Sequence, residues 1–141
     1  MSIFSLVYTS ISSQKLSDLQ LKELLKKSRN NNENRAITGM LLYMDPYFIQ
    51  VLEGEEKVIS EAFDTIKIDP RHQKVSIIYK KPTSERCFAN WTMGFNKVRK
   101  EDIAGLEGFN DYLQRPTPEL FVKAPNQVTE LLNKFRREIL F

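Results

Sequence analysis

Apolar residues recur at two different spacings along this chain, and the spacings divide its first two-thirds into predicted strands and helices. Short apolar runs predict strands, whereas apolar residues three and four positions apart predict helices. Strands are predicted at residues 3–10, 37–44, 47–53, 75–79 and 91–98, and helices at residues 16–30 and 55–68. This order, β-α-β-β-α-β with one added strand, is typical of a ferredoxin-like α+β sandwich.

Local signals mark the ends of several of these elements. Ser17 is a good N-cap for the first helix, and Gln20 three positions later completes a capping box. Asp45 and Pro46 predict a tight turn that joins two strands in a hairpin, and Pro70 ends the second helix. The exit of the first helix is predicted at a run of side chains that tolerate left-handed conformations, namely Asn30, Asn31, Asn32 and Asn34.

The strand at residues 47–53 is apolar on both of its faces, which indicates a sheet with no solvent-exposed face. The two predicted helices can cover one face. We expect C-terminal helices, or a partner chain, to cover the other. The tail contains a weak helix at residues 103–113 and a strong one at residues 126–139. The apolar stripe of the strong helix consists of Val128, Leu131, Leu132, Phe135 and Ile139.

The charge balance changes this picture little. The chain of 141 residues has 21 basic and 18 acidic residues, for a net charge of +3. Its densest basic stretch, residues 71–86, is read as a solvated surface in preference to a nucleic-acid contact. No apolar run reaches the roughly 18 residues that a membrane span needs. We therefore expect neither a nucleic-acid partner nor a membrane.

The composition also excludes several kinds of chemistry. One cysteine and one histidine cannot form a structural zinc site or a disulfide framework, so no metal is expected. The five glycines form no phosphate-binding loop, and no paired acids or nucleophile stand out, so we do not expect an enzyme. The N-terminus lacks the basic region of a signal peptide, and the single thiol suits a cytoplasmic location.

Two polar residues occupy strand positions where apolar residues are expected. Gln50 lies between Phe48 and Leu52 on one face of its strand, and Tyr8 holds a similar place beside Leu6. A buried amide or phenol without a partner costs about 1–3 kcal/mol. Either the two side chains satisfy each other in a structural network, or they line a pocket for a planar polar ligand.

Other polar residues are suited to the second alternative, a pocket for a planar polar ligand. Asn31 and Asn32 lie at the exit of the first helix, and their amides present donors and acceptors in one plane. Asp69, Arg71 and His72 follow the second helix. They are suited to hold a sugar or a phosphate.

Several separated segments together resemble the BLUF domains, a family of blue-light sensors that use flavin. The segments are LVYTS at residues 6–10, NN at 31–32, ITGMLLY at 37–43, FIQVLEG at 48–54, DPRH at 69–72 and RCFANWTM at 86–93. Each segment is a weak signal alone, but their order and spacing agree over residues 1–98. The resemblance implies a flavin-binding photosensor domain at residues 1–98 and a C-terminal helical extension at residues 99–141.

The resemblance also implies a cofactor and a mechanism. The flavin, FAD with FMN as an alternative, is expected between the two helices, bound without a covalent link. Tyr8 matches the electron donor to the excited flavin, and Gln50 matches the glutamine whose hydrogen bonds light rearranges. The expected flavin-binding residues are Tyr8, Leu24, Ser28, Asn31, Asn32, Phe48, Gln50, Leu52, Asp69, Arg71 and His72. Asn32 is the firmer of the two asparagine matches.

Trp91 and Met93 match alternating residues of the output strand in this family, and their other reading is ordinary core packing. Some relatives carry a basic residue at the place of Thr65 that contacts the flavin side chain. Lys67 or Arg71 are the expected substitutes here.

The implied function is a blue-light photoreceptor that signals to a separate partner protein, within a homo-oligomer. The alternative is a flavin- or small-ligand-binding adaptor or dimerisation module without photosignalling.

Overall fold

The computed structural model describes residues 3–44, 46–89, 92–97 and 132, and the fold is given for these residues. Its strands are β1 (Ile3–Ser12), β2 (Thr38–Met44), β3 (Tyr47–Glu55), β4 (His72–Thr83) and β5 (Gly94–Lys97). Its helices are α1 (Asp18–Asn34) and α2 (Glu56–Lys67). The five strands form one sheet in the order β4-β1-β3-β2-β5, and only β5 runs parallel to its neighbour, β2.

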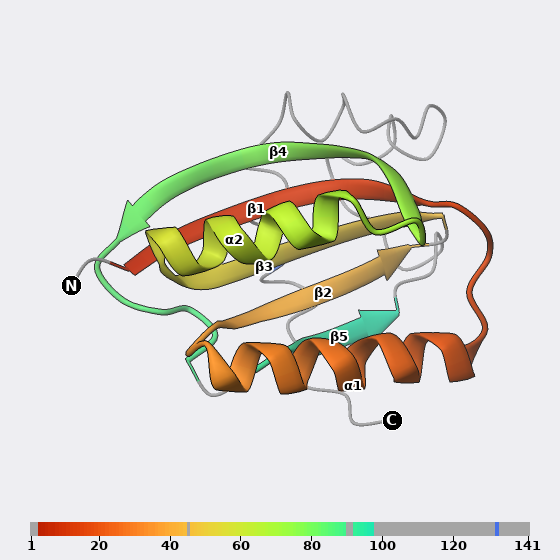
Figure 1. The fold of residues 1–141 in the computed structure, drawn as a ribbon, viewed down its shortest axis with the longest axis horizontal. Helices are drawn as coiled ribbons and strands as arrows, with labels where there is room; N and C mark the ends of the chain where they lie inside the picture. Colours follow the sequence, from red (N-terminus) through yellow and green to blue (C-terminus); the bar gives the residue numbers. More distant parts are fainter. Residues whose placement is uncertain (1–2, 45, 90–91, 98–131, 133–141) are drawn as a thin grey trace.

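Figure 1 shows α1 and α2 on the same face of the sheet. Each helix connects two strands that have a third strand between them: α1 leads from β1 to β2 around β3, and α2 leads from β3 to β4 around β1. This arrangement is the split βαβ pattern of ferredoxin-like folds. The predicted α+β class and element order are confirmed, with β5 as the added edge strand.

The N-terminus of α1 forms as its residues predict. The Ser17 hydroxyl accepts a hydrogen bond from the backbone N–H of Gln20 at 3.1 Å. The Gln20 side chain accepts one in return from the backbone N–H of Ser17 at 2.8 Å. This reciprocal capping box satisfies two of the amides that a helix start leaves unpaired.

The predicted exit of α1 is wrong. The asparagine run does not end the helix but forms its last turn, up to Asn34. The left-handed residue is Ala36, with φ of 54°, after which the N–H of Ile37 donates to the carbonyl of Asn32 at 3.0 Å. This contact is the long hydrogen bond of a Schellman-type ending, which closes the helix whatever side chain stands at the turn.

The structure also corrects the start of the last strand. That strand was expected at residues 91–98, but β5 begins at Gly94, so Met93 lies in a bend before it. Trp91 and Asp45 lie outside the described residues, as does the boundary expected after residue 98. Strands β1 and β4 are longer than predicted because they pair with each other over their whole length.

Both faces of the sheet are buried. On the helix side, side chains of the central strands pack against Leu21, Leu25, Ile59 and Phe63. The opposite face is equally apolar, and the buried residues there are Val7, Met40, Leu42, Ile49 and Val51. The expectation of a sheet without a wet face is confirmed. The predicted tail helices lie outside the described residues except for Leu132, which is helical and buried.

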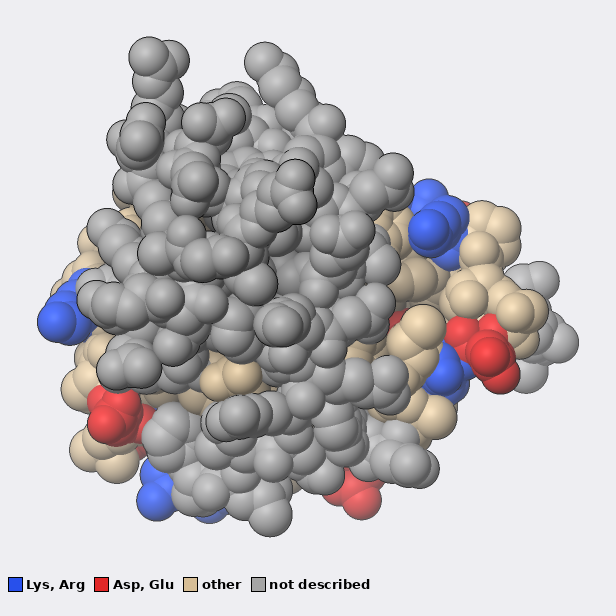
Figure 2. Space-filling model, turned by 180° about the vertical axis from the view of Figure 1, so that it is seen from behind, with Lys and Arg blue, Asp and Glu red and all other residues tan. Residues whose placement is uncertain are grey.

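The surface of the described residues carries charges of both signs. Figure 2 shows the molecule from behind, and the described Lys and Arg residues alternate there with Asp and Glu around the rim. No helix in the described part of the chain is long and apolar enough to cross a membrane.

A buried carboxylate anchors the connection between β4 and β5. Glu53 on β3 is only 1% exposed. Its two oxygens accept hydrogen bonds from the backbone N–H of Cys87 at 2.7 Å, from that of Phe88 at 2.9 Å and from the Thr38 hydroxyl at 3.1 Å. Arg86 adds bonds to the carbonyls of Glu53 and Ala36. Three donors at one carboxylate explain how a charge is tolerated at this depth.

Replacing Glu53 by alanine should lower the free energy of unfolding by about 1–3 kcal/mol, because two backbone amides and one hydroxyl would lose their acceptor. Urea unfolding followed by circular dichroism measures the change. Glu61→Ala, at an exposed position of α2, is the matched control and should change stability by no more than about 0.5 kcal/mol. Equal effects of the two substitutions would contradict the anchoring role of Glu53.

Candidate functional site

A cavity lies between α1 and α2 above the central strands. Its empty space, including the open mouth, is about 680 Å³. All but two of the predicted flavin-binding residues line it, namely Tyr8, Leu24, Ser28, Asn31, Phe48, Gln50, Asp69, Arg71 and His72. Four further residues line it as well, namely Lys27, Leu41, Thr65 and Ile66. The structure therefore brings together residues that are far apart in the sequence.

The floor of the cavity is a hydrogen-bonded pair from the two central strands. Tyr8 on β1 lies directly opposite Gln50 on β3 in the sheet register. The Tyr8 hydroxyl donates to Oε1 of Gln50, and Nε2 of Gln50 lies 3.3 Å from Sδ of Met93. The two side chains thus satisfy each other, as the first reading predicts, and they also line a cavity. The planar polar ligand of the second reading stays a prediction.

The Tyr8 hydroxyl is a strongly held proton donor. Burial raises the pKa of its phenol well above the usual value, and the negative charge of Asp69 raises it further, whereas Arg71 opposes the shift. The ring of Phe63 packs edge-on against Tyr8 with centroids 5.4 Å apart. Tyr8 therefore stays neutral at ordinary pH, and its hydroxyl remains a donor to the Gln50 oxygen.

Two residues of α1 hold the segment that carries Met93. The side-chain amide of Asn32 donates to the carbonyl of Thr92 at 2.7 Å, and Nε of Arg29 donates to the carbonyl of Met93 at 2.9 Å. Asn32 is buried and does not line the cavity, and neither does Leu52 in the core below it. The structure thus places Asn31 at the cavity and Asn32 behind it.

The rim beyond α2 is an ordered polar cluster. Arg71 donates through Nε to both carboxylate oxygens of Asp69 at 3.0 Å, and a second contact joins Nη2 to the same group. This pairing lowers the pKa of the Asp69 carboxyl. His72 lies between the Ser10 hydroxyl, 2.9 Å from Nδ1, and the carbonyl of Ile66, which accepts from Nε2. Arg71 and His72 are therefore already occupied by protein partners.

Lys27 is a further cavity residue, and the helical spacing of α1 carries a signal for it that hydrophobic patterning does not show. Leu24, Lys27, Ser28 and Asn31 are spaced at i, i+3, i+4 and i+7, so they share one face of α1. All four line the cavity. Of the two cations expected to substitute for a basic residue at Thr65, Arg71 lies at the cavity and Lys67 does not.

A ferredoxin-like domain with a polar and apolar cavity over its central strands is a ligand-binding domain. Among the described residues no cluster of His, Cys, Asp and Glu could hold a metal ion. The cavity instead offers amides, apolar walls and a charged rim, which suit an organic ligand.

The chain belongs to the BLUF family, described as sensors of blue-light using FAD, whose model matches residues 3–94. Similar solved structures include BlrB, a BLUF protein in its dark state, at 29% identity and a TM-score of 0.73, covering 92% of each chain. They also include BlsA in its photo-activated state, at 26% identity and a TM-score of 0.75, covering 94% of each chain. The resemblance found in the sequence is confirmed.

Curated relatives are longer proteins with a named enzymatic activity. The photoactivated adenylate cyclase subunit beta of Euglena longa is 32% identical over 112 residues, which are 79% of this chain and 13% of that protein. The corresponding subunit of Euglena gracilis is 30% identical over the same shares. The chain thus spans about an eighth of the length of these relatives.

Asp69→Asn tests the rim cluster through its pH dependence. Because the pKa of Asp69 is lowered in the folded state, its contribution to stability is present above the unfolded value of about 3.9 and is lost as the pH falls through the folded value. The wild type should exceed the variant by at most about 1 kcal/mol near neutral pH, since the pair is partly solvated. The difference should shrink as the pH falls below about 3.9 and should vanish once Asp69 is protonated in the folded state as well. Urea unfolding over this pH range measures it, and a constant difference would contradict the ion pair.

Proposed function

We propose that this protein is a cytoplasmic blue-light photoreceptor that binds a flavin non-covalently in the cavity between α1 and α2. The observation that carries the proposal is the chain of contacts from Tyr8 through Gln50 to Met93 on the cavity floor. A simple ligand-binding adaptor needs no such chain. A sensor does, because a change at the ligand must reach a distant surface.

The lining residues fit a flavin. Leu24, Leu41, Phe48 and Ile66 supply apolar contacts for a flat ring system, and Gln50 and Asn31 supply amide donors and acceptors for its polar edge. A flavin bound here would absorb blue light and accept an electron. We propose FAD as the natural ligand, because the matching family is described by it, with FMN as the alternative.

Gln50 can act as a two-state element. In the structure its oxygen accepts from Tyr8, and its NH₂ group points at the Met93 sulfur. Rotating the amide by half a turn exchanges its oxygen and its NH₂ group, whereas moving a proton from its nitrogen to its oxygen exchanges donor and acceptor without moving either atom. After rotation the amide oxygen would face the Met93 sulfur, which is only a weak acceptor and cannot donate. The reversal therefore releases Met93 without changing the net charge of the buried pair.

We further propose that the signal leaves through Met93, β5 and residues 99–141 to a separate partner protein, within a homo-oligomer. Met93 immediately precedes β5, and β5 is an edge strand held only by β2 in the described sheet. A bend at the end of an edge strand can shift at lower cost than a central strand. Trp91, which lies outside the described residues, is proposed to take part in the same movement.

Tyr8→Phe and Gln50→Leu should each abolish the reversible red shift of the flavin spectrum under blue light while leaving flavin bound. The first removes the donating hydroxyl, and the second removes the amide whose bonds rearrange. Light-minus-dark absorbance spectra of the purified proteins measure the effect. Tyr79→Phe, on β4 outside the cavity, is the matched control and should keep the full shift. A normal shift in Tyr8→Phe or Gln50→Leu would remove that residue from the mechanism.

The output route predicts a pattern of hydrogen exchange. Amides of residues 91–125 should change their protection between darkness and steady blue light, whereas α2 should change little beyond its contacts to the cavity. Hydrogen exchange measured by mass spectrometry on the full chain tests this output route. Unchanged protection throughout β5 and residues 99–125 would overturn the route and point to the helix face as the output surface.

A further inference from the structure

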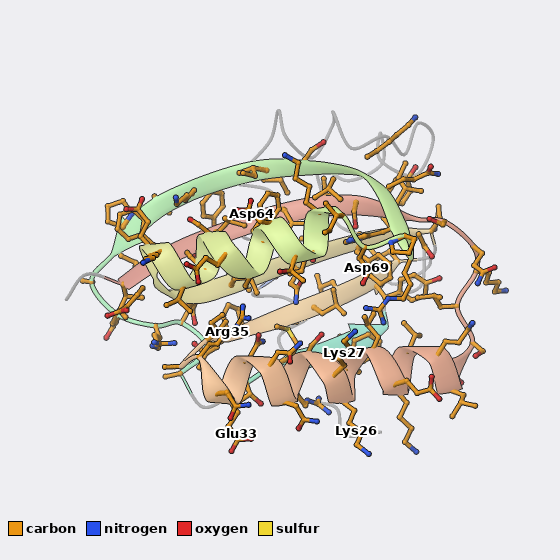
Figure 3. The ribbon with its side chains drawn as sticks, viewed as in Figure 1. Lys26, Lys27, Glu33, Arg35, Asp64 and Asp69 are labelled. Atoms are coloured by element: carbon orange, nitrogen blue, oxygen red, sulfur yellow. The ribbon has the colours of Figure 1, made fainter. Side chains whose placement is uncertain are left out.

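Within the described residues, one cation at the cavity rim is left without a protein partner. Lys27 lines the cavity from α1. Figure 3 shows it on the side of the helix that faces α2 and Asp69, while Lys26 lies on the opposite side. Within the part of the chain that the structure describes, the Lys27 ammonium makes neither a hydrogen bond nor an ion pair.

The other charges at the rim compensate one another. The Asp69 carboxylate is bound by the Arg71 guanidinium through its Nε and Nη2 atoms, so these two charges cancel. The His72 ring is held between Ser10 and the carbonyl of Ile66. Adding Lys27 leaves the charged side chains of the rim with one uncompensated positive charge. A fixed positive charge at the mouth of a partly enclosed cavity attracts an anionic ligand group.

Neutral groups beside Lys27 suit the same ligand group. Ser28 and Thr65 also line the cavity, one from each helix. The Thr65 hydroxyl donates to the carbonyl of Glu61 on its own helix, so Ser28 supplies the hydroxyl donor. Hydroxyl and ammonium donors together are a common environment for phosphate oxygens, and lysine acts there as a mobile point charge. Of the apolar residues that line the cavity, Leu41 and Phe48 are buried, whereas Lys27 is exposed. A ligand with a flat apolar end and an anionic tail would match this order.

We propose that Lys27 is the phosphate contact of this cavity and that it makes the protein selective for phosphorylated flavins over riboflavin. The inference rests on the proposed flavin-binding function. The terminal phosphate of FMN and the pyrophosphate of FAD share the required chemistry. Lys27 is thus a specificity-determining residue that acts on the ligand tail, separate from the Tyr8–Gln50 pair on the floor.

The test compares the affinities of riboflavin, FMN and FAD for the flavin-free full-length chain, measured by quenching of flavin fluorescence. FMN should bind about two- to fivefold more tightly than riboflavin, as expected for one partly solvated ion pair. The preference should fall as the salt concentration rises from about 0.01 M to about 1 M, because salt screens exposed charges. FMN against riboflavin is the decisive comparison, since FAD adds contacts through its adenosine.

Variants of neighbouring lysines isolate the role of Lys27. Lys27→Ala should abolish the preference for FMN and leave the affinity for riboflavin unchanged, whereas Lys27→Arg should retain the preference. Lys26→Ala, which removes the same charge from the opposite side of α1, should behave as the wild type. Retention of the FMN preference in Lys27→Ala would overturn the proposal, as would an equal loss for all three flavins.

The outcomes also separate this inference from the proposed function. Equal binding of riboflavin, FMN and FAD by the wild type would overturn the role of Lys27 and leave flavin binding intact. Failure of the wild type to bind any flavin would overturn both. A preference for FMN and FAD alike would support contact with either phosphate group. A preference for FMN alone would support contact with the terminal phosphate.

Discussion

The pairing of β1 with β3 is the constraint on which the site depends. Their register sets Tyr8 opposite Gln50 at the centre of a sheet that is buried on both faces. A slip of either strand by one residue would turn its own side chain, Tyr8 or Gln50, to the other face, away from the cavity. The neighbouring pair adds a second constraint, because a Cβ at Gly39 on β2 would overlap the carbonyl oxygen of Val51. Only glycine allows β2 to approach β3 so closely, so the register is fixed from both sides.

Helix α1 joins the cavity to the segment that enters β5. One of its faces lines the cavity through residues such as Leu24 and Asn31. From the same helix, Arg29 and Asn32 hold the backbone carbonyls of Met93 and Thr92. Gln50 contacts Met93 from the sheet side. The bend at residues 92–93 is therefore held from two directions, since α1 binds its backbone carbonyls and Gln50 contacts the Met93 sulfur. In the proposed mechanism only the second contact changes.

Much of this arrangement was predictable from the sequence, because the spacing of apolar residues fixes strands and helices, and the polar exceptions Tyr8 and Gln50 mark the site. The failures have physical reasons. Side-chain preference alone predicts a helix end at the asparagine run, but the end is set by backbone hydrogen bonds around Ala36. Alternation predicts a strand at Met93, because it does not reveal a bend held by side chains from α1. An exposed lysine such as Lys27 carries no apolar signal, although its helical spacing from Leu24 and Asn31 indicates the same face.

Two polar residues of β3 show how the fold distinguishes an anchor from a switch. Gln50 and Glu53 are separated by three positions, so they point to opposite faces of the sheet. Glu53 can keep a buried charge because the hydroxyl of Thr38 and two backbone amides converge on it, and such a fully bound group has no alternative arrangement of similar energy. Gln50 is neutral and contacts only Tyr8 and a weakly accepting sulfur within the described residues. In the proposed mechanism, reversing its amide exchanges donor and acceptor without moving charge into the core, and a ligand that binds one of the two states better can then change their populations. A carboxylate at this position would be charged in one arrangement and a donor only when protonated, and it could not serve both states at one pH.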